Sequence, residues 1–138
     1  MISLGTRLRD GTFHYEAFLV DTGSDDVILP LYFASLLGID LNRAKAFHHG
    51  LADSSRMTVR YADVEFRLAT TPFHYVQWRA TVGFAAMPRP IFGWAGGLEY
   101  FNANFDWMLA RMTLVPLPTL PLTASAFPSP DRTRQLPM

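Results

Sequence analysis

The sequence contains no cysteine, which excludes disulfides, thiolate metal sites and a cysteine nucleophile. It has no excess charge either, because twelve basic residues balance twelve acidic ones, whereas a nucleic-acid-binding surface normally carries a basic excess. The first residues lack the basic and then apolar pattern of a signal peptide. We therefore expect a cytoplasmic protein that binds no nucleic acid.

The sequence also has little room for a long apolar helix. The one long uncharged stretch, Met112 to Pro130, contains five prolines. These prolines forbid a helix, so we expect no membrane span. We expect residues 1–115 to form the folded domain. Residues 116–138 are expected to form a Pro-rich tail that is extended or disordered and lies outside the core.

Apolar side chains, by contrast, are abundant and make up 49% of the chain. A chain of 138 residues fits one ordinary domain with a real core. The apolar content is high for a soluble domain of this size. Some of the apolar surface is therefore expected to meet a partner.

Short strand-like segments separated by turns fill most of the chain. Asp10-Gly11, a strong hairpin signal, separates Ile2–Leu8 from Phe13–Val20. The second of these segments ends in a continuous apolar run, as a strand does where it enters a core. Farther on, residues 73–82 alternate between two faces, and a last strand is expected over residues 111–115.

Two short helices are expected within this β pattern. The first covers Leu31–Leu37, opened by the preceding proline and ended by Gly38. The second covers residues 95–101. Within Met57–Leu68 the apolar phase slips by one near residues 62–63, which indicates a bend or a bulge. The inventory predicts an all-β fold with one or two short helices.

The most informative segment runs from Ala17 to Pro30 and carries Asp21-Thr22-Gly23-Ser24 between two apolar runs. It resembles the active-site signature of aspartic proteases, and the Asp-Asp and Val-Ile-Leu that follow are similar to the single-domain retropepsin branch. Downstream, Ile91-Phe92-Gly93 resembles the second hallmark of that family, two apolar residues and a glycine. The resemblance covers residues 2–115. It implies a retropepsin-like closed β-barrel, the acid protease fold, in a homodimer.

The resemblance also implies a role for each residue of the motif. Asp21 would be the catalytic carboxyl, Thr22 would hydrogen-bond across the dimer, and Ser24 would help to hold the carboxylate. Gly23 would let the backbone approach the carboxylate and the substrate closely. The chemistry uses two carboxyls about 3 Å apart that share one proton, one acting as base and the other as acid. It requires no cofactor and no metal.

One aspartate per chain is not enough for this chemistry. The sequence contains a single Asp-Thr-Gly and is too short for the two lobes of a pepsin-like enzyme. Two chains would therefore each supply one Asp21, and the expected function is a homodimeric aspartic endopeptidase acting on a peptide or protein substrate. The alternative is a catalytically inactive retropepsin-like dimerisation or peptide-binding module. A third interpretation is an unrelated β-barrel binding protein.

Four further residues are candidates for substrate binding. Ser24, Asp25 and Asp26 follow the catalytic turn, and Ile91 belongs to the second hallmark. The other interpretation of the two acids is a solvated turn. A calcium loop does not fit, because the sixth position counted from Asp21 is Asp26 rather than glycine.

A flap that covers the cleft is expected from the family. The best candidate is the turn at residues 47–55, with Gly50 as its glycine, between two strand-like stretches. His48 and His49 lie in the same segment, but neighbouring residues of a strand point to opposite faces. We therefore expect no metal site there.

One position departs from the family pattern. Retropepsins commonly have an arginine directly after the second-hallmark glycine, where it pairs with the acid that follows the catalytic turn. This sequence has Trp94 instead, and Arg7 or Arg89 would have to replace the arginine. The departure is the reason for keeping the inactive-module alternative.

Overall fold

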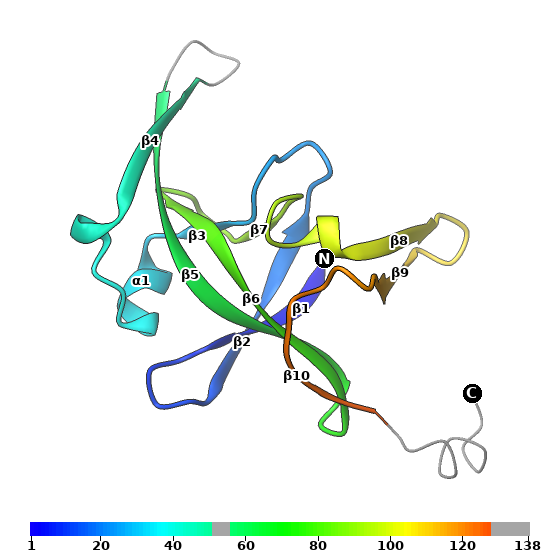
Figure 1. The fold of residues 1–138 in the computed structure, drawn as a ribbon. Coiled ribbons are helices and arrows are strands. Elements are labelled where there is room, and N and C mark those ends of the chain that lie inside the picture. The colour runs from blue at the N-terminus through cyan, green and yellow to red at the C-terminus, as the bar shows by residue number, and fades with distance from the viewer. Residues whose placement is uncertain (51–55, 128–138) are drawn as a thin grey trace.

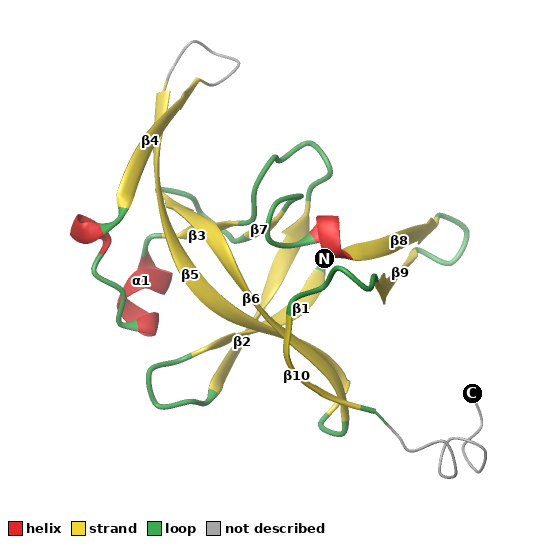
Figure 2. Ribbon diagram, in the orientation of Figure 1, coloured by secondary structure: helices red, strands yellow, loops and turns green. Residues whose placement is uncertain are grey.

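The computed structural model describes residues 1–50 and 56–127, and strands dominate it (Figures 1 and 2). The elements in chain order are β1 (Ile2–Arg7), β2 (Phe13–Val20), β3 (Ile28–Pro30), α1 (Tyr32–Leu37), η1 (Leu41–Arg43), β4 (Lys45–Gly50), β5 (Arg56–Thr71), β6 (His74–Ala85), β7 (Ile91–Phe92), η2 (Leu98–Tyr100), β8 (Phe101–Asp106), β9 (Arg111–Pro116) and β10 (Leu122–Ala126). Here α denotes an α-helix and η a single 3₁₀ turn. The prediction of a mostly β fold is confirmed.

Six strands close into a barrel. Their order is β6, β3, β7, β2, β1 and β5, and the ring closes because β5 also pairs with β6. Strand β4 extends the sheet beyond β5, and β10 pairs with β6. Strands β8 and β9 form a separate two-stranded sheet (Figure 1). The closed barrel predicted from the sequence is therefore present.

The first hairpin and the first helix form where the sequence predicts them. Gly11 has a φ of 89°, a conformation that favours glycine, and Asp10 accepts a hydrogen bond from the Thr12 amide at 2.9 Å. The helix α1 ends at Gly38, whose φ of 69° lets its amide bond back to the last turn.

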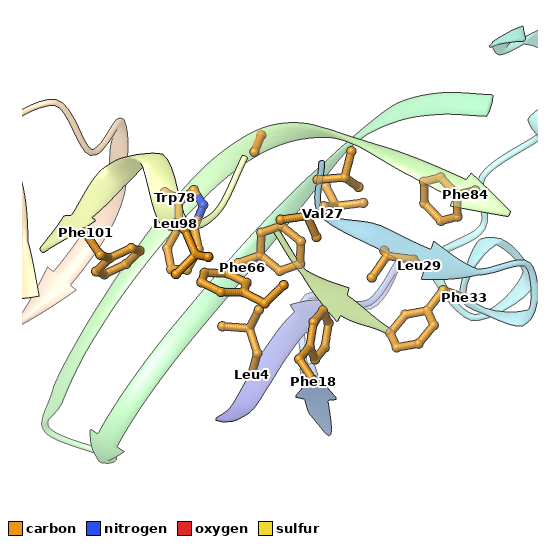
Figure 3. Close-up of a cluster of buried hydrophobic side chains, with 14 of the residues drawn as sticks. Leu4, Phe18, Val27, Leu29, Phe33, Phe66, Trp78, Phe84, Leu98 and Phe101 are labelled. Atoms are coloured by element: carbon orange, nitrogen blue, oxygen red, sulfur yellow. The ribbon is translucent and has the colours of Figure 1, made fainter. Parts of the chain in front are cut away.

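The main core fills the barrel with aromatic and aliphatic side chains (Figure 3). Phe18 of β2 and Phe66 of β5 pack edge to face, 6.2 Å between ring centroids. The buried Trp78 of β6 donates its indole N–H to the carbonyl of Gly96 at 2.9 Å, so its polar atom is satisfied. The predicted alternation holds over the middle of this strand, where Trp78, Ala80 and Val82 are buried while Arg79 and Thr81 are exposed. It does not extend to Gln77, which is buried although it lies on the face of Arg79.

Of the bend or bulge predicted near residues 62–63, the bulge is absent from β5. Its pairing with β6 runs without a register shift through these residues. Val59 instead packs in a small second cluster with Ile28, while Val64 joins the main core. Odd and even positions of a strand face opposite sides. The shift in the apolar alternation of β5 therefore marks the point where burial passes from one face of the strand to the other.

The second predicted helix is shorter than expected. Only Leu98–Tyr100 forms a 3₁₀ turn, because Gly96 and Gly97 precede it and Gly96 has a φ of 87°. Within residues 1–50 and 56–127, no helix has the length and apolar character needed to cross a membrane.

The boundary predicted after Val115 is too early. Leu120 is only 6% exposed and belongs to the main core. Strand β10 pairs antiparallel with β6, and Thr123 donates to Glu65 at 2.7 Å. Pairing is possible because β10 starts after Pro121 and contains no proline itself. The end of the predicted tail, residues 128–138, lies outside the described residues.

Candidate functional site

The loop that carries the Asp-Thr-Gly motif connects β2 to β3, and β7 lies between these two strands. Ile91 of β7 pairs in parallel with Leu19 of β2 and antiparallel with Ile28 of β3. The two hallmark segments of the sequence are therefore adjacent in space (Figure 1). Ile91 supports the loop from the sheet.

The Asp21 carboxylate is held by its own turn. Its Oδ1 accepts a hydrogen bond from the Gly23 amide at 2.9 Å, and the Asp21 carbonyl accepts from the Ser24 amide at 3.2 Å. The Asp21 amide donates to the carbonyl of Phe92 at 3.1 Å. Asp21 is half-buried, whereas Thr22 and Gly23 are exposed. The carboxylate is thus oriented while the tip of the loop stays open to solvent.

Gly93 lets the second hallmark lie directly beneath the loop. A Cβ atom at this position would stand 2.2 Å from the carbonyl oxygen of Asp26 and 2.7 Å from that of Ser24. Next to it, the Trp94 amide donates to the Ser24 carbonyl at 3.1 Å, and the Ala95 amide donates to the Asp25 carbonyl at 2.8 Å. Only glycine allows this approach of two backbones.

Trp94 contacts the loop through its side chain as well. Its indole N–H donates to the carbonyl of Thr22 at 2.6 Å, while 47% of the residue stays exposed. Arg7 pairs with Glu65 at 3.1 Å. No ion pair joins Arg7 or Arg89 to either loop acid among the described residues. Neither arginine therefore takes the place of the family's arginine.

Asp26 accepts a hydrogen bond from a tyrosine of β5. The Tyr61 hydroxyl donates to Asp26 Oδ2 at 2.7 Å. Burial, and then this hydrogen bond, raise the pKa of Tyr61 above its usual range, so Tyr61 remains a proton donor. Ser24 Oγ donates to the Asp26 carbonyl at 2.8 Å, so this hydroxyl braces the loop instead of holding the Asp21 carboxylate as predicted. Asp25 is exposed.

Strands β4 and β5 flank the predicted flap turn. They pair antiparallel from Lys45 opposite Tyr61 to Gly50 opposite Arg56, and Figure 1 shows them projecting from the barrel. Residues 51–55 of the predicted flap turn lie outside the described residues. Gly50 is the last residue of β4, and its role as the flap glycine stays a prediction.

An open groove of about 510 Å³ lies at the base of this hairpin. Phe47 and Tyr61 pack edge to face, 5.5 Å between ring centroids, and the Lys45 ammonium lies 5.1 Å from the Phe47 ring. Lys45, Phe47, Tyr61, Asp26 and Thr81 line the groove. It therefore joins the candidate flap to the loop that carries Asp21, and it offers aromatic surface between a cation and an anion.

Sequence reasoning missed Tyr61 as a member of the site. The only signal was its place in an alternating strand, where a half-buried tyrosine normally finds a partner for its hydroxyl. That partner, Asp26, is 35 residues away in the sequence. As to metals, no group of three or more His, Asp or Glu side chains placed to hold an ion occurs in residues 1–50 and 56–127.

The arrangement orients one carboxylate beside a loop tip that is open to solvent, and one chain provides only one Asp21. A second carboxyl would complete an acid and base pair. Comparison with family models, curated proteins and solved structures finds no match to this chain.

Proposed function

We propose that the chain is one subunit of a homodimeric aspartic endopeptidase whose acid and base are the two Asp21 carboxyls. The proposal rests on the contacts that hold Asp21 in place. Its carboxylate accepts from the Gly23 amide, on a loop that β7 and Gly93 hold from below. Such an arrangement fixes a carboxylate while leaving its reactive side open.

In the proposed reaction, the ionised Asp21 takes a proton from water as the water oxygen bonds to the peptide carbonyl carbon. The protonated Asp21 of the other copy donates its proton to the carbonyl oxygen. The resulting tetrahedral intermediate then collapses. The C–N bond breaks as the Asp21 that took the proton from water gives it to the leaving nitrogen. A hydroxyl of the intermediate returns its proton to the other Asp21 as the new carboxyl group forms, so the pair again shares one proton.

The groove at the base of the flap hairpin supports a peptide substrate. The faces of Phe47 and Tyr61 suit an apolar side chain, and an extended peptide between the hairpin and the loop could use exposed backbone groups of both. We propose extended, largely apolar segments as the substrate class.

A second candidate is the catalytically inactive dimerisation or peptide-binding module. The observation that favours it is Trp94, which bonds to the Thr22 carbonyl at the position where the family has an arginine. In this alternative the groove binds a peptide, and no bond is cleaved.

Replacing Asp21 by Asn tests the proposal. The change keeps the shape of the side chain and its acceptor for the Gly23 amide, but it removes the shared proton. Peptidase activity on an apolar peptide library should vanish while the thermal denaturation midpoint stays near that of the wild type.

The matched control is Asp25→Asn, the same chemical change on an exposed acid of the same loop. It should retain the rate at saturating substrate and alter KM alone. Undiminished hydrolysis by purified Asp21→Asn protein would overturn the mechanism. An inactive wild type that still binds peptides would favour the binding module.

A further inference from the structure

The hairpin of β8 and β9 has one wholly apolar face. Cross-strand neighbours on that face are Phe101 with Pro116, Ala103 with Leu114, and Phe105 with Met112. The opposite face carries polar pairs, among them Asp106 with Arg111. An apolar face of this kind is stable in water only where something covers it.

The body of the protein covers only the base of this face. Phe101 is 5% exposed and belongs to the main core, and Ala103 and Leu114 pack against that core. Toward the tip the cover ends, since Phe105 is 43% exposed. Figure 1 shows β8 and β9 projecting away from the barrel.

The turn at the end of the hairpin is the most exposed apolar segment among the described residues. Trp107 is 89% exposed, Met108 94% and Leu109 61%. The turn is nevertheless ordered, because the Leu109 amide donates to Asp106 Oδ1 at 3.1 Å. This bond limits the backbone freedom of the turn before binding, and tryptophan is among the side chains that most often dominate interfaces.

The exposed apolar surface reaches the candidate active site. A pocket of about 350 Å³ beside the hairpin is lined by Met1, Val20, Phe105, Trp107 and Met112, among others. Val20 directly precedes Asp21. Whatever covers the hairpin therefore also lies next to the catalytic loop.

We propose that a second copy of this chain covers the β8–β9 hairpin, with Trp107 and Met108 as the apolar anchors of a twofold interface. The inference rests on the proposed function, which is incomplete without a second Asp21. The pocket lined by Trp107 and Val20 places this surface beside the Asp21 loop, where the second copy would have to lie. A bilayer would favour a basic cluster, whereas the pocket lining carries one base and one acid, Arg111 and Asp106.

Sedimentation equilibrium of the full chain at micromolar concentration tests the interface. The wild type should be a dimer, and Trp107→Asp should raise the dissociation constant by about a hundredfold or more. The matched control is Phe73→Asp, because Phe73 is 79% exposed in the turn between β5 and β6 and should leave the dimer intact. Met108→Asp serves as a second variant. Circular dichroism melts should show all three variants folded.

The outcomes separate the interface from the chemistry. A wild-type dimer that persists in Trp107→Asp and Met108→Asp overturns the interface, and Asp21-dependent hydrolysis would still uphold the proposed function. If Trp107→Asp and Met108→Asp both dissociate the dimer but the wild type cleaves no peptide, the interface is upheld and the proposed enzyme activity is overturned. A monomeric wild type whose Trp107 instead drives binding to lipid vesicles overturns the interface in favour of a membrane.

Discussion

Gly93→Ala is the perturbation that connects the fold most directly to the candidate site. The added methyl group would stand 2.2 Å from the carbonyl oxygen of Asp26 and 2.7 Å from that of Ser24. Both obstacles are backbone atoms, which cannot swing away as the end of a side chain can. To reach an ordinary contact of 3.4 Å, the loop must move by about 1 Å.

The expected cost follows from this displacement. Overpacking a buried site typically costs about 1–3 kcal/mol, and a clash with backbone belongs at the upper end. A loss of about 3 kcal/mol would lower the melting temperature of a domain of this size by roughly 10 °C. The same movement shifts Asp21, and a misplacement of about 1 Å can reduce a rate about a hundredfold.

Thermal denaturation followed by circular dichroism, together with peptide hydrolysis, measures both effects. Gly11→Ala is the matched control, since its methyl group would meet only Arg7 at 3.7 Å, and the left-handed backbone there costs about 1 kcal/mol. This control should leave hydrolysis unchanged. The reasoning fails if Gly93→Ala melts within about 2 °C of the wild type.

Two further changes test contacts that the structure revealed. Tyr61→Phe should lower the free energy of unfolding by about 1 kcal/mol at neutral pH, with Tyr15→Phe as the neutral control. Because the pKa of Tyr61 in the folded protein is raised above its ordinary value of 10.0, the hydrogen bond to Asp26 contributes its full stabilisation below pH 10. Urea titrations should show the difference in unfolding free energy between the wild type and Tyr61→Phe shrinking above pH 10. Leu120→Ala should cost about 2–5 kcal/mol in the same assay, whereas the half-exposed Leu122→Ala should cost little; equal effects would contradict the placement of Leu120 in the core.

Local signals in the sequence were sufficient for the barrel strands and the first helix. Asp10-Gly11 and Gly38 sit at positions whose backbone conformation favours glycine, so the residue type itself reports the structure. Gly93 was singled out by the resemblance, and the structure gives its physical reason, because a side chain there would keep the loop away. These features depend on residues close in sequence or on a glycine that no other residue can replace.

Contacts between distant parts of the chain could not be predicted. Tyr61 finds Asp26 through the pairing of β5 with β6 and of β6 with β3, which no local pattern encodes. Leu120 lies among prolines, and their number predicted a tail, yet Leu120 packs in the core. The strand that follows it, β10, is short and free of proline, which is enough for it to pair with β6. Trp94 was visible in the sequence as a departure from the pattern that the motif resembles, but its hydrogen bond to the Thr22 carbonyl was not.

The stoichiometry of a transition-state mimic tests the central claim most directly. A peptide containing statine places a hydroxyl where the attacked carbonyl would lie and should bind both Asp21 carboxyls at once. Isothermal titration should give about 0.5 inhibitor per chain for the wild type and no binding for Asp21→Asn. One inhibitor per chain, or equal binding by the two proteins, would contradict a site formed by two copies of Asp21.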